Sequence, residues 1–481
     1  MSGRLLARLG VLFVLLLAGL LAVMVSRTLL LAPQERKAVA LPALAESSDE
    51  PAMVSRLSRA ITFPTLTGND AAFDDFHAFL RDAFPLVHAS LSLKIFGHSL
   101  LFHWDSGQGC KPTLLLAHQD VVPVSSPEDW RYPPFSGVND EGYIWGRGAM
   151  DDKVSVMAIL EAVEGMLAAD QQPPCDVWLA FGHDEETGGV HGAARMAAWL
   201  LSQGLQFELV LDEGGMVLPG STLGISAPVA LIGIAEKGYL SVVLRAHGEP
   251  GHSSRPPAKT AVGQVAAAIQ TLQSHPRPAS LGMPVRQMLE QVAPWQPFAK
   301  RMVFANLWLF EPLVLQQLAS KPETNALIRT TQAPTMLNAG VKDNVLPATA
   351  EAVVNFRLLP GESRDSILGW LEAILPSDVQ VTVKDGFFAE ASSISPAHSA
   401  AFERVAGLAA ALPDEPVPAP FLMIAGSDAR HYQALSENVL RFLPVSLQQE
   451  DIARFHGPNE RLARDQYALM VRFYAGVLQS K

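Results

Sequence analysis

Several short apolar runs in this sequence each end in acidic or imidazole side chains, and this feature constrains the fold more than any other. Runs of this length are typical of strands buried on both faces of a sheet. In open α/β sheets, ligands collect at the carboxyl ends of the strands. We therefore predict an α/β sheet with a polar site along one edge. The runs are residues 111–117 before His118 and Asp120, residues 176–181 before Asp184, Glu185 and Glu186, and residues 207–211 before Asp212 and Glu213.

The acidic turn at residues 184–186 is the centre of the predicted site. Adjacent carboxylates on a strand point to opposite faces, so a loop is needed before Glu185 and Glu186 can serve one site. Gly188 and Gly189 allow the backbone to bend there. An isolated acidic turn is usually a solvated surface feature. The recurrence of acids at the same point of successive strands argues against that interpretation here.

Two further motifs carry groups suited to metal binding. His118 and Asp120 are two residues apart, so the imidazole can hold a metal while the carboxylate fixes its tautomer and orientation. Asp151 lies among glycines at the start of a helix predicted to run through Met166. It can act as a helix cap, the default for an Asp at that position. Its two oxygens also let it bridge two cations.

Composition sets outer limits on domains and partners. A chain of 481 residues that is 49% hydrophobic predicts roughly two to four domains. The net charge is -12 without a basic block, so we expect no nucleic-acid partner. Cys110 and Cys175 are the only cysteines, which excludes a thiolate zinc cluster. A disulfide between them stays open, and two unpaired thiols are the simpler interpretation.

The N-terminus is predicted to be a membrane anchor, residues 1–26, followed by a linker, residues 27–50. Arg4 and Arg8 precede an uncharged apolar run over residues 9–25. A cleaved signal peptide is the alternative, but the small-residue sequence at 38–40 lies far beyond that run. Both interpretations place the body outside the cytoplasm, either membrane-anchored or secreted.

The order of these motifs, with a late His456, resembles the zinc-dependent metallopeptidase family 20, which includes carboxypeptidase S, aminoacylase and succinyl-diaminopimelate desuccinylase. The resemblance extends from about residue 51 to the C-terminus. The segments 212–215 and 455–460 look most like the carboxypeptidase S and N-acyl-amino-acid hydrolase branch. It implies a di-zinc exopeptidase-like domain with a mixed, mostly parallel sheet flanked by helices, built from residues 51–235 and 389–481.

The resemblance also implies two zinc ions, with cobalt or manganese as alternatives, bridged by Asp151 and a water. Asp120 would orient His118, and Glu185 would be the general base. Asp212 and Glu213 are adjacent in the sequence, so either carboxylate could be the metal ligand. We select Asp212 because it matches the family motif. The implied metal ligands are His118, Asp151, Glu186, Asp212 and His456.

A change of pattern from residue 236 to residue 388 predicts an inserted ferredoxin-like α+β domain, in the order strand, helix, two strands, helix, strand. In the family this insert is a lid or dimerisation domain. Its His252 resembles a catalytic histidine that stabilises the oxyanion, often from a partner subunit; the alternative is an ordinary turn histidine. The stretch 274–335 is predicted to be helical in part. The resemblance implies that Asn344 and Arg357 position the substrate. Beyond the insert, Ser427 matches a turn of the family, and we predict that Arg430 helps to hold a substrate carboxylate.

The sequence therefore predicts a di-zinc hydrolase that cleaves an amide or peptide bond next to a free carboxylate, in a small peptide or an N-acyl amino acid. An aminopeptidase or dipeptidase is the nearest alternative, and it would need an acidic pocket for the substrate ammonium group. A non-catalytic receptor-like ectodomain is a further alternative. A protein of that kind is expected to lack some of the metal-ligating residues or the general base, whereas this sequence has a suitable residue at every position of the family signature.

Overall fold

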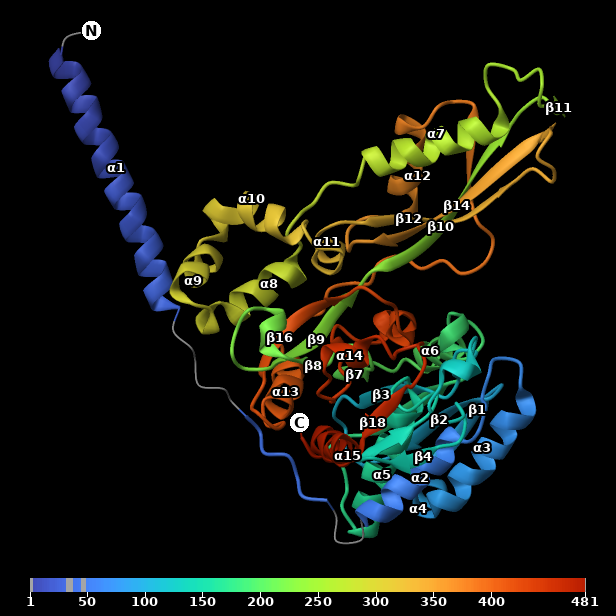
Figure 1. Ribbon diagram of the computed structural model, residues 1–481. Coiled ribbons are helices and arrows are strands. Elements are labelled where there is room, and N and C mark those ends of the chain that lie inside the picture. The colour runs from blue at the N-terminus through green and yellow to red at the C-terminus, as the bar shows by residue number, and fades with distance from the viewer. Residues whose placement is uncertain (1–2, 32–37, 45–48, 481) are drawn as a thin grey trace.

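The computed structural model describes residues 3–31, 38–44 and 49–480. Its largest unit is a mixed nine-stranded sheet in which the neighbouring strands β6, β3, β7 and β17 run parallel (Figure 1). Their carboxyl ends meet at one sheet edge, so the predicted fold class is confirmed. The strand order is β1 (Ser92–Phe96), β2 (Ser99–Trp104), β6 (Val177–Gly182), β3 (Thr113–His118), β7 (Leu209–Asp212), β17 (Val439–Arg441), β9 (Val229–Glu236) and β16 (Val417–Met423), with β8 (Val217–Leu218) paired to β9.

Helices pack on both faces of this sheet because its central strands are apolar on both faces. Alternate residues of β3 divide between two cores: Leu115 joins one, and Leu114 and Leu116 join the other. One face is covered by α2 (Glu50–Ile61), α3 (Asp70–Ala83), α4 (Pro85–Ser90), α5 (Lys153–Ala168), α13 (Ala400–Ala409) and α15 (Arg464–Gln479), and the other by α6 (Ala193–Ser202) and η5 (Asp428–Leu435).

The last helix, α15, begins at Arg464. The residues just before it form β18 (Arg461–Ala463), which pairs with β5 (Tyr143–Trp145). This pairing completes a small sheet with β4 (Val138–Asp140). It ties the chain just after His456 to the segment that leads into Asp151.

A second, antiparallel sheet leaves the first where β9 ends at Glu236 and β10 begins at Gly238. We call residues 236–388 the lid. Its strand order, β12-β14-β10-β15, places the first and third strands of the predicted series in the middle, as in a ferredoxin-like domain. Its elements are β10 (Gly238–His247), β11 (Gly251–His252), α7 (Ala261–Ser274), β12 (Thr331–Ala339), β13 (Val345–Leu346), β14 (Thr349–Leu358), α12 (Arg364–Ile374) and β15 (Val379–Val383).

The stretch 274–335 is helical in part, as predicted, and packs against the edge of the large sheet. Its apolar side chains, such as Val285 and Leu289, join a core with Val229 of β9 and Ala419 of β16. The helices are α8 (Met283–Val292), α9 (Phe298–Ala305), α10 (Leu307–Leu318) and α11 (Pro322–Ile328).

The N-terminal helix α1 (Gly3–Leu30) extends past the predicted anchor end at residue 26. Residues 7–30 are predominantly apolar and long enough to cross a membrane, with a mean hydropathy of 2.8. The predicted linker lies partly outside the described residues. Residues 38–44 run along the body, where the Val39 backbone N–H donates to the Gly407 carbonyl at 2.9 Å.

Cys110 and Cys175 form a disulfide, so the simpler expectation of two unpaired thiols is wrong. The cause is the strand order. Cys110 precedes β3 and Cys175 precedes β6, and these strands are parallel neighbours in which Thr113 faces Val177. The two cysteines therefore enter the sheet side by side.

Reduction of this disulfide is expected to lower the free energy of unfolding by roughly 4 kcal/mol, because the bond closes a loop with a sequence separation of 65. Denaturant titration with and without reductant measures the change. The double variant Cys110→Ser/Cys175→Ser should match the reduced protein and ignore reductant. Equal stability of the oxidised and reduced protein would contradict the prediction.

Candidate metal centre

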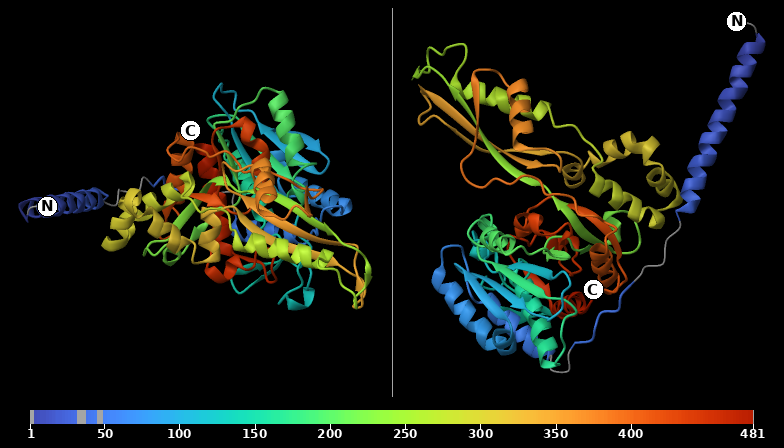
Figure 2. Two further views of the ribbon diagram at one scale, coloured as in Figure 1. Left: turned by 90° about the horizontal axis from the view of Figure 1, so that it is seen from above. Right: turned by 180° about the vertical axis from the view of Figure 1, so that it is seen from behind.

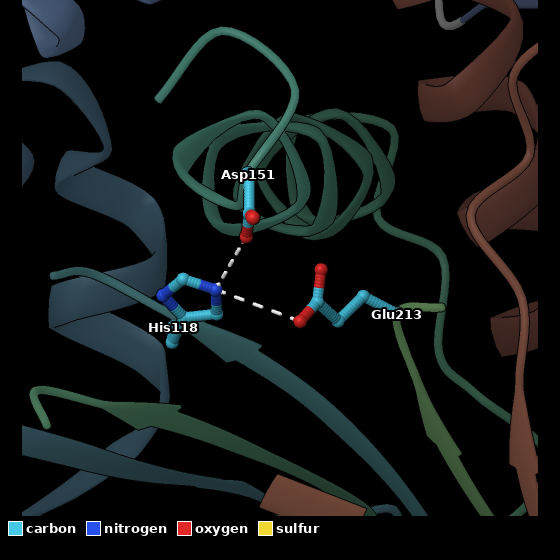
Figure 3. A group of neighbouring side chains, drawn as sticks. All are labelled: His118, Asp151 and Glu213. Atoms are coloured by element: carbon cyan, nitrogen blue, oxygen red, sulfur yellow. Dashed lines mark hydrogen bonds and ion pairs between the residues drawn. The ribbon is translucent and has the colours of Figure 1, made fainter. Parts of the chain in front are cut away.

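His118, Asp151 and Glu213 form a first group of candidate metal ligands (Figure 3). His118 ends β3, Asp151 lies in the loop before α5, and Glu213 follows β7, so three distant segments meet at the same sheet edge. His118 Nε2 lies 2.8 Å from Asp151 Oδ1 and 3.5 Å from Glu213 Oε1. Its other ring nitrogen, Nδ1, lies 3.0 Å from the Asp120 carbonyl oxygen, which directs Nε2 toward the group.

Asp151, Glu186 and His456 form a second group that shares Asp151 with the first. His456 Nε2 lies 3.0 Å from Asp151 Oδ2 and 3.4 Å from Glu186 Oε2. Asp151 thus offers one oxygen to each imidazole. This is the bridging arrangement that the sequence predicts for two cations.

The chemistry of the donor set fits divalent cations. Imidazole nitrogens and carboxylate oxygens are ligands that zinc accepts. Glu186 Oε1 is buried without a hydrogen-bond partner among the described residues. Burial and the nearby Asp151 raise the pKa of Glu213 to about 8. A bound cation would stabilise these crowded carboxylates in their charged form.

Asp212 does not join either group, although the motif match selects it as a ligand. Its carboxylate accepts hydrogen bonds from the backbone N–H groups of Ala429, at 2.7 Å, and Glu213, at 3.0 Å. The buried Asp212 therefore secures the start of η5. Glu213, one residue past the end of β7, turns toward His118 and replaces Asp212 in the candidate ligand set.

Asp120 lies behind the first group and also holds the acidic turn. Its Oδ1 atom lies 3.4 Å from His118 Nδ1, and the carboxylate accepts hydrogen bonds from the backbone N–H groups of Glu185, at 3.2 Å, and Glu186, at 3.0 Å. One buried carboxylate thus orients an imidazole and fixes the positions of two others. Burial raises the pKa of Glu185 well above its ordinary value.

The four predicted substrate-binding residues fall in two places. Near the metal groups, Arg430 Nη2 donates to Glu185 Oε1 at 2.8 Å, so Arg430 is paired with the predicted base. Ser427 is fully buried, and its hydroxyl donates to Glu236 Oε2 at 3.2 Å. Because it has no exposed surface, Ser427 supports this loop and does not face a substrate.

Arg357 of the lid lies beside the same region. Its guanidinium stacks over the Tyr239 ring at 4.7 Å, the Tyr239 ring lies 5.3 Å from that of Phe387, and Arg430 stacks over Phe387 at 5.0 Å. Burial lowers the pKa of Arg357, and nearby Arg430 acts in the same direction. Among the described residues, no carboxylate forms a salt bridge with the Arg357 guanidinium, which leaves a half-buried cation free to bind an anion.

His252 and Asn344 lie at the far end of the lid. His252 belongs to β11, which lies well away from β3 and β7 (Figure 1). Asn344 is its neighbour, because the Asn344 carbonyl accepts from the Ser253 backbone N–H at 3.1 Å. Within one chain, the structure does not bring either residue to the metal groups.

Glu460 is a positioning residue that the sequence interpretation missed. Its buried carboxylate accepts from the backbone N–H groups of Met150, at 2.8 Å, and Asp151, at 3.2 Å, and from Arg147 Nη1 at 2.6 Å. It therefore fixes the loop that presents Asp151. Its place four residues after His456 was the only signal, and no periodicity distinguishes it from a surface acid.

Comparison with known proteins identifies the family. The profile of peptidase family M20/M25/M40 matches residues 114–480. A probable carboxypeptidase S-like protein of Dictyostelium discoideum is 39% identical over 89% of this chain and 85% of its own length. An N-fatty-acyl-amino acid synthase/hydrolase of Xenopus tropicalis is 37% identical over 97% of this chain and 94% of its own length.

A solved structure supports the fold. An M20 family metallo-carboxypeptidase from Sulfolobus solfataricus superposes with a TM-score of 0.67, covering 90% of this chain and 99% of the other at 19% identity. The family match spans most of the chain and includes the segments that bear both ligand groups. The chain therefore belongs to peptidase family M20/M25/M40, as the resemblance predicted, and is a metallohydrolase of that family.

Proposed function

We propose that this protein hydrolyses the amide bond of an N-acyl amino acid or a small peptide next to a free carboxylate. The observation that carries the proposal is Arg357, which forms no salt bridge with any described residue, beside two candidate metal-ligand groups that share Asp151. A guanidinium binds a carboxylate through two parallel hydrogen bonds. The related chains named for carboxypeptidase and N-fatty-acyl-amino acid hydrolase activities favour the same substrate class.

Two zinc ions, with cobalt or manganese as alternatives, would be held by His118, Asp151 and Glu213 on one side and by Asp151, Glu186 and His456 on the other. When bound, such cations polarise the scissile carbonyl and lower the pKa of the attacking water. Glu185 accepts the proton of that water and delivers it to the leaving nitrogen.

Arg430 supports the base in this proposal. Its guanidinium holds Glu185 at 2.8 Å and is itself held by the Ser427 carbonyl at 2.5 Å. This pairing fixes the Glu185 carboxylate toward the shared ligand groups. Arg357 makes no such pair within the part of the chain that the structure describes, and it would receive the substrate carboxylate.

His252 and Asn344 would complete the site from a second copy of the chain. They are exposed at the tip of the lid and do not reach the metal groups of their own chain. A homodimer through the lid, as the family resemblance implies, would bring them to the partner's site. There His252 would stabilise the oxyanion, an interaction that contributes roughly 2.7–4 kcal/mol in other enzymes.

The body is proposed to lie outside the cytoplasm, anchored by α1. The apolar helix at residues 7–30 supports a signal or an anchor, and the Cys110–Cys175 disulfide is typical of oxidising compartments. The packing of α1 against α9 favours an anchor that is retained in the protein over a signal peptide that is cleaved.

The purified protein is expected to hydrolyse N-acyl amino acids with a free carboxylate much faster than the same compounds with a terminal amide, and chelator should abolish both rates. Arg357→Gln should raise the KM for the carboxylate substrate roughly 10- to 100-fold, the equivalent of about 1.5–3 kcal/mol for a charged hydrogen bond. Steady-state kinetics measure both effects.

The matched control is Arg245→Gln, which removes an arginine of the same lid sheet that is already paired with Glu351 at 2.6 Å. It should leave the KM unchanged. Hydrolysis of free-amine peptides alone would instead support the aminopeptidase alternative. If the Arg357 variant still prefers the free carboxylate to the terminal amide as strongly as the unsubstituted protein does, Arg357 does not bind the substrate carboxylate.

A further inference from the structure

Helices α9 and α10 present a group of large apolar side chains to the surface. Phe298, Trp308 and Leu313 are 52%, 55% and 54% exposed, and Leu309 is 38% exposed. We call these four residues the α9–α10 patch. Single exposed apolar residues are ordinary, but four within sixteen positions (313 − 298 + 1 = 16) on adjoining helices indicate an interaction surface.

The patch adjoins the end of α1 that enters the body. Arg27 Nε donates to the Ala305 carbonyl at 3.0 Å, and Asn306 Nδ2 donates to the Met24 carbonyl at 3.2 Å. Trp308 Nε1 in turn donates to Asn306 Oδ1 at 3.3 Å. Asn306 therefore links the N-terminal helix directly to a member of the patch.

The views agree on how these helices lie. α1 leaves the body at α9 and runs outward, and α10 lies on the side of α9 toward which α1 extends (Figures 1 and 2). A plane across α1 near its contact with α9 therefore passes close to α10. If α1 spans a bilayer, that plane corresponds to the bilayer surface.

We propose that the α9–α10 patch inserts into the lipid interface beside α1, as a second membrane contact of this protein. The proposal rests on the proposed retention of α1 in a bilayer, with which the patch is continuous. Tryptophan is favoured at the boundary between acyl chains and headgroups, where its ring is apolar and its N–H is bonded. Phe298, Leu309 and Leu313 supply the apolar area that holds an interfacial helix in place.

The charges around the patch suit an anionic lipid surface. Glu311 is the only acidic residue between 298 and 319, and it is paired with Arg286 at 2.6 Å. The exposed Lys300 and the neighbouring Arg301 leave this segment with an excess of positive charge.

Two points of attachment restrict the body more than one helix does. A single span lets the body tilt and rotate on its linker, whereas a second contact beside it fixes one face toward the lipid. In this arrangement the helical stretch 283–328, which carries none of the candidate catalytic residues, orients the whole enzyme on the membrane.

Spin labels on the full-length protein in vesicles of phosphatidylcholine and phosphatidylglycerol test the proposal. The native cysteines are joined in a disulfide and leave no free thiol among the described residues, so a label attaches only to an introduced cysteine. Leu313→Cys probes the patch, and Leu16→Cys probes the middle of α1. Ile95→Cys, 56% exposed on β1, is the matched control on the body. Substrate hydrolysis by each variant checks its fold.

We expect the Leu313 label to be reached more readily by oxygen than by a water-soluble nickel complex, with the order reversed at Ile95. A Leu313 label as accessible to nickel as the Ile95 label, while Leu16 is immersed, overturns the patch proposal and leaves the anchor intact. Loss of immersion at Leu16 as well overturns both. Spin–spin coupling between Leu313 labels would show that a second copy covers the patch, which also overturns the proposal.

Discussion

Glu185→Ala is expected to lower kcat by about two to four orders of magnitude while the metal content stays unchanged. The substitution removes the proposed proton acceptor but no member of either ligand group. Glu185 is held in place through its backbone N–H, which donates to Asp120, so the turn that carries Glu186 should persist without the Glu185 side chain. Single-turnover kinetics and elemental analysis of the same preparation measure both quantities.

Glu186→Ala is the matched control for that prediction. The two residues are adjacent, and each is bonded to the same Asp120 carboxylate, but only Glu186 faces His456, at 3.4 Å. The Glu186 variant should lose metal along with activity. If the Glu185 variant loses its metal and the Glu186 variant keeps it, the two roles are reversed.

Glu213→Gln is expected to weaken the binding of one of two metal ions by more than the roughly 10- to 100-fold that loss of an outer partner causes. The change removes a carboxyl group that lies 3.5 Å from His118 and that a bound cation would hold in its charged form. Metal titration by calorimetry, starting from the metal-free protein, should show one tight site and one weakened site.

Asp212→Asn should behave differently from Glu213→Gln, although Asp212 and Glu213 are adjacent in the sequence. The Asp212 side chain accepts two backbone hydrogen bonds, and an amide offers one oxygen in place of two. We expect a loss of roughly 1–3 kcal/mol in unfolding free energy, with both metal sites intact. A variant that keeps its stability and loses a metal would restore Asp212 as the ligand and remove Glu213 from the set.

The family and the sheet edge that bears the site could be predicted from the sequence because both depend on local patterns. The runs before His118, Asp184 and Asp212 are mostly apolar, as strands covered on both faces require, and they form the parallel strands β3, β6 and β7. The spacing of the motifs then restricts which side chains can meet at that edge. The match over residues 114–480 confirms the family.

Only the tertiary structure shows which of Asp212 and Glu213 faces His118. The two residues are consecutive, so their side chains diverge, and the sequence does not show which direction faces His118. A backbone N–H 217 residues away, at Ala429, binds the Asp212 carboxylate, while the Glu213 carboxylate lies beside His118. The disulfide likewise depends on tertiary structure, because Cys110 and Cys175 meet only when β3 and β6 are neighbours in the sheet.

The positions of His252 and the α9–α10 patch were likewise set by the fold. A histidine in a glycine-containing turn has the same local sequence whether it lies at a site or at the tip of a lid. Local sequence determines which strands and helices form, since backbone geometry and apolar periodicity act over a few residues. Contacts between distant segments decide which carboxylate faces a cation and which apolar surface is left open, because these depend on how whole elements pack.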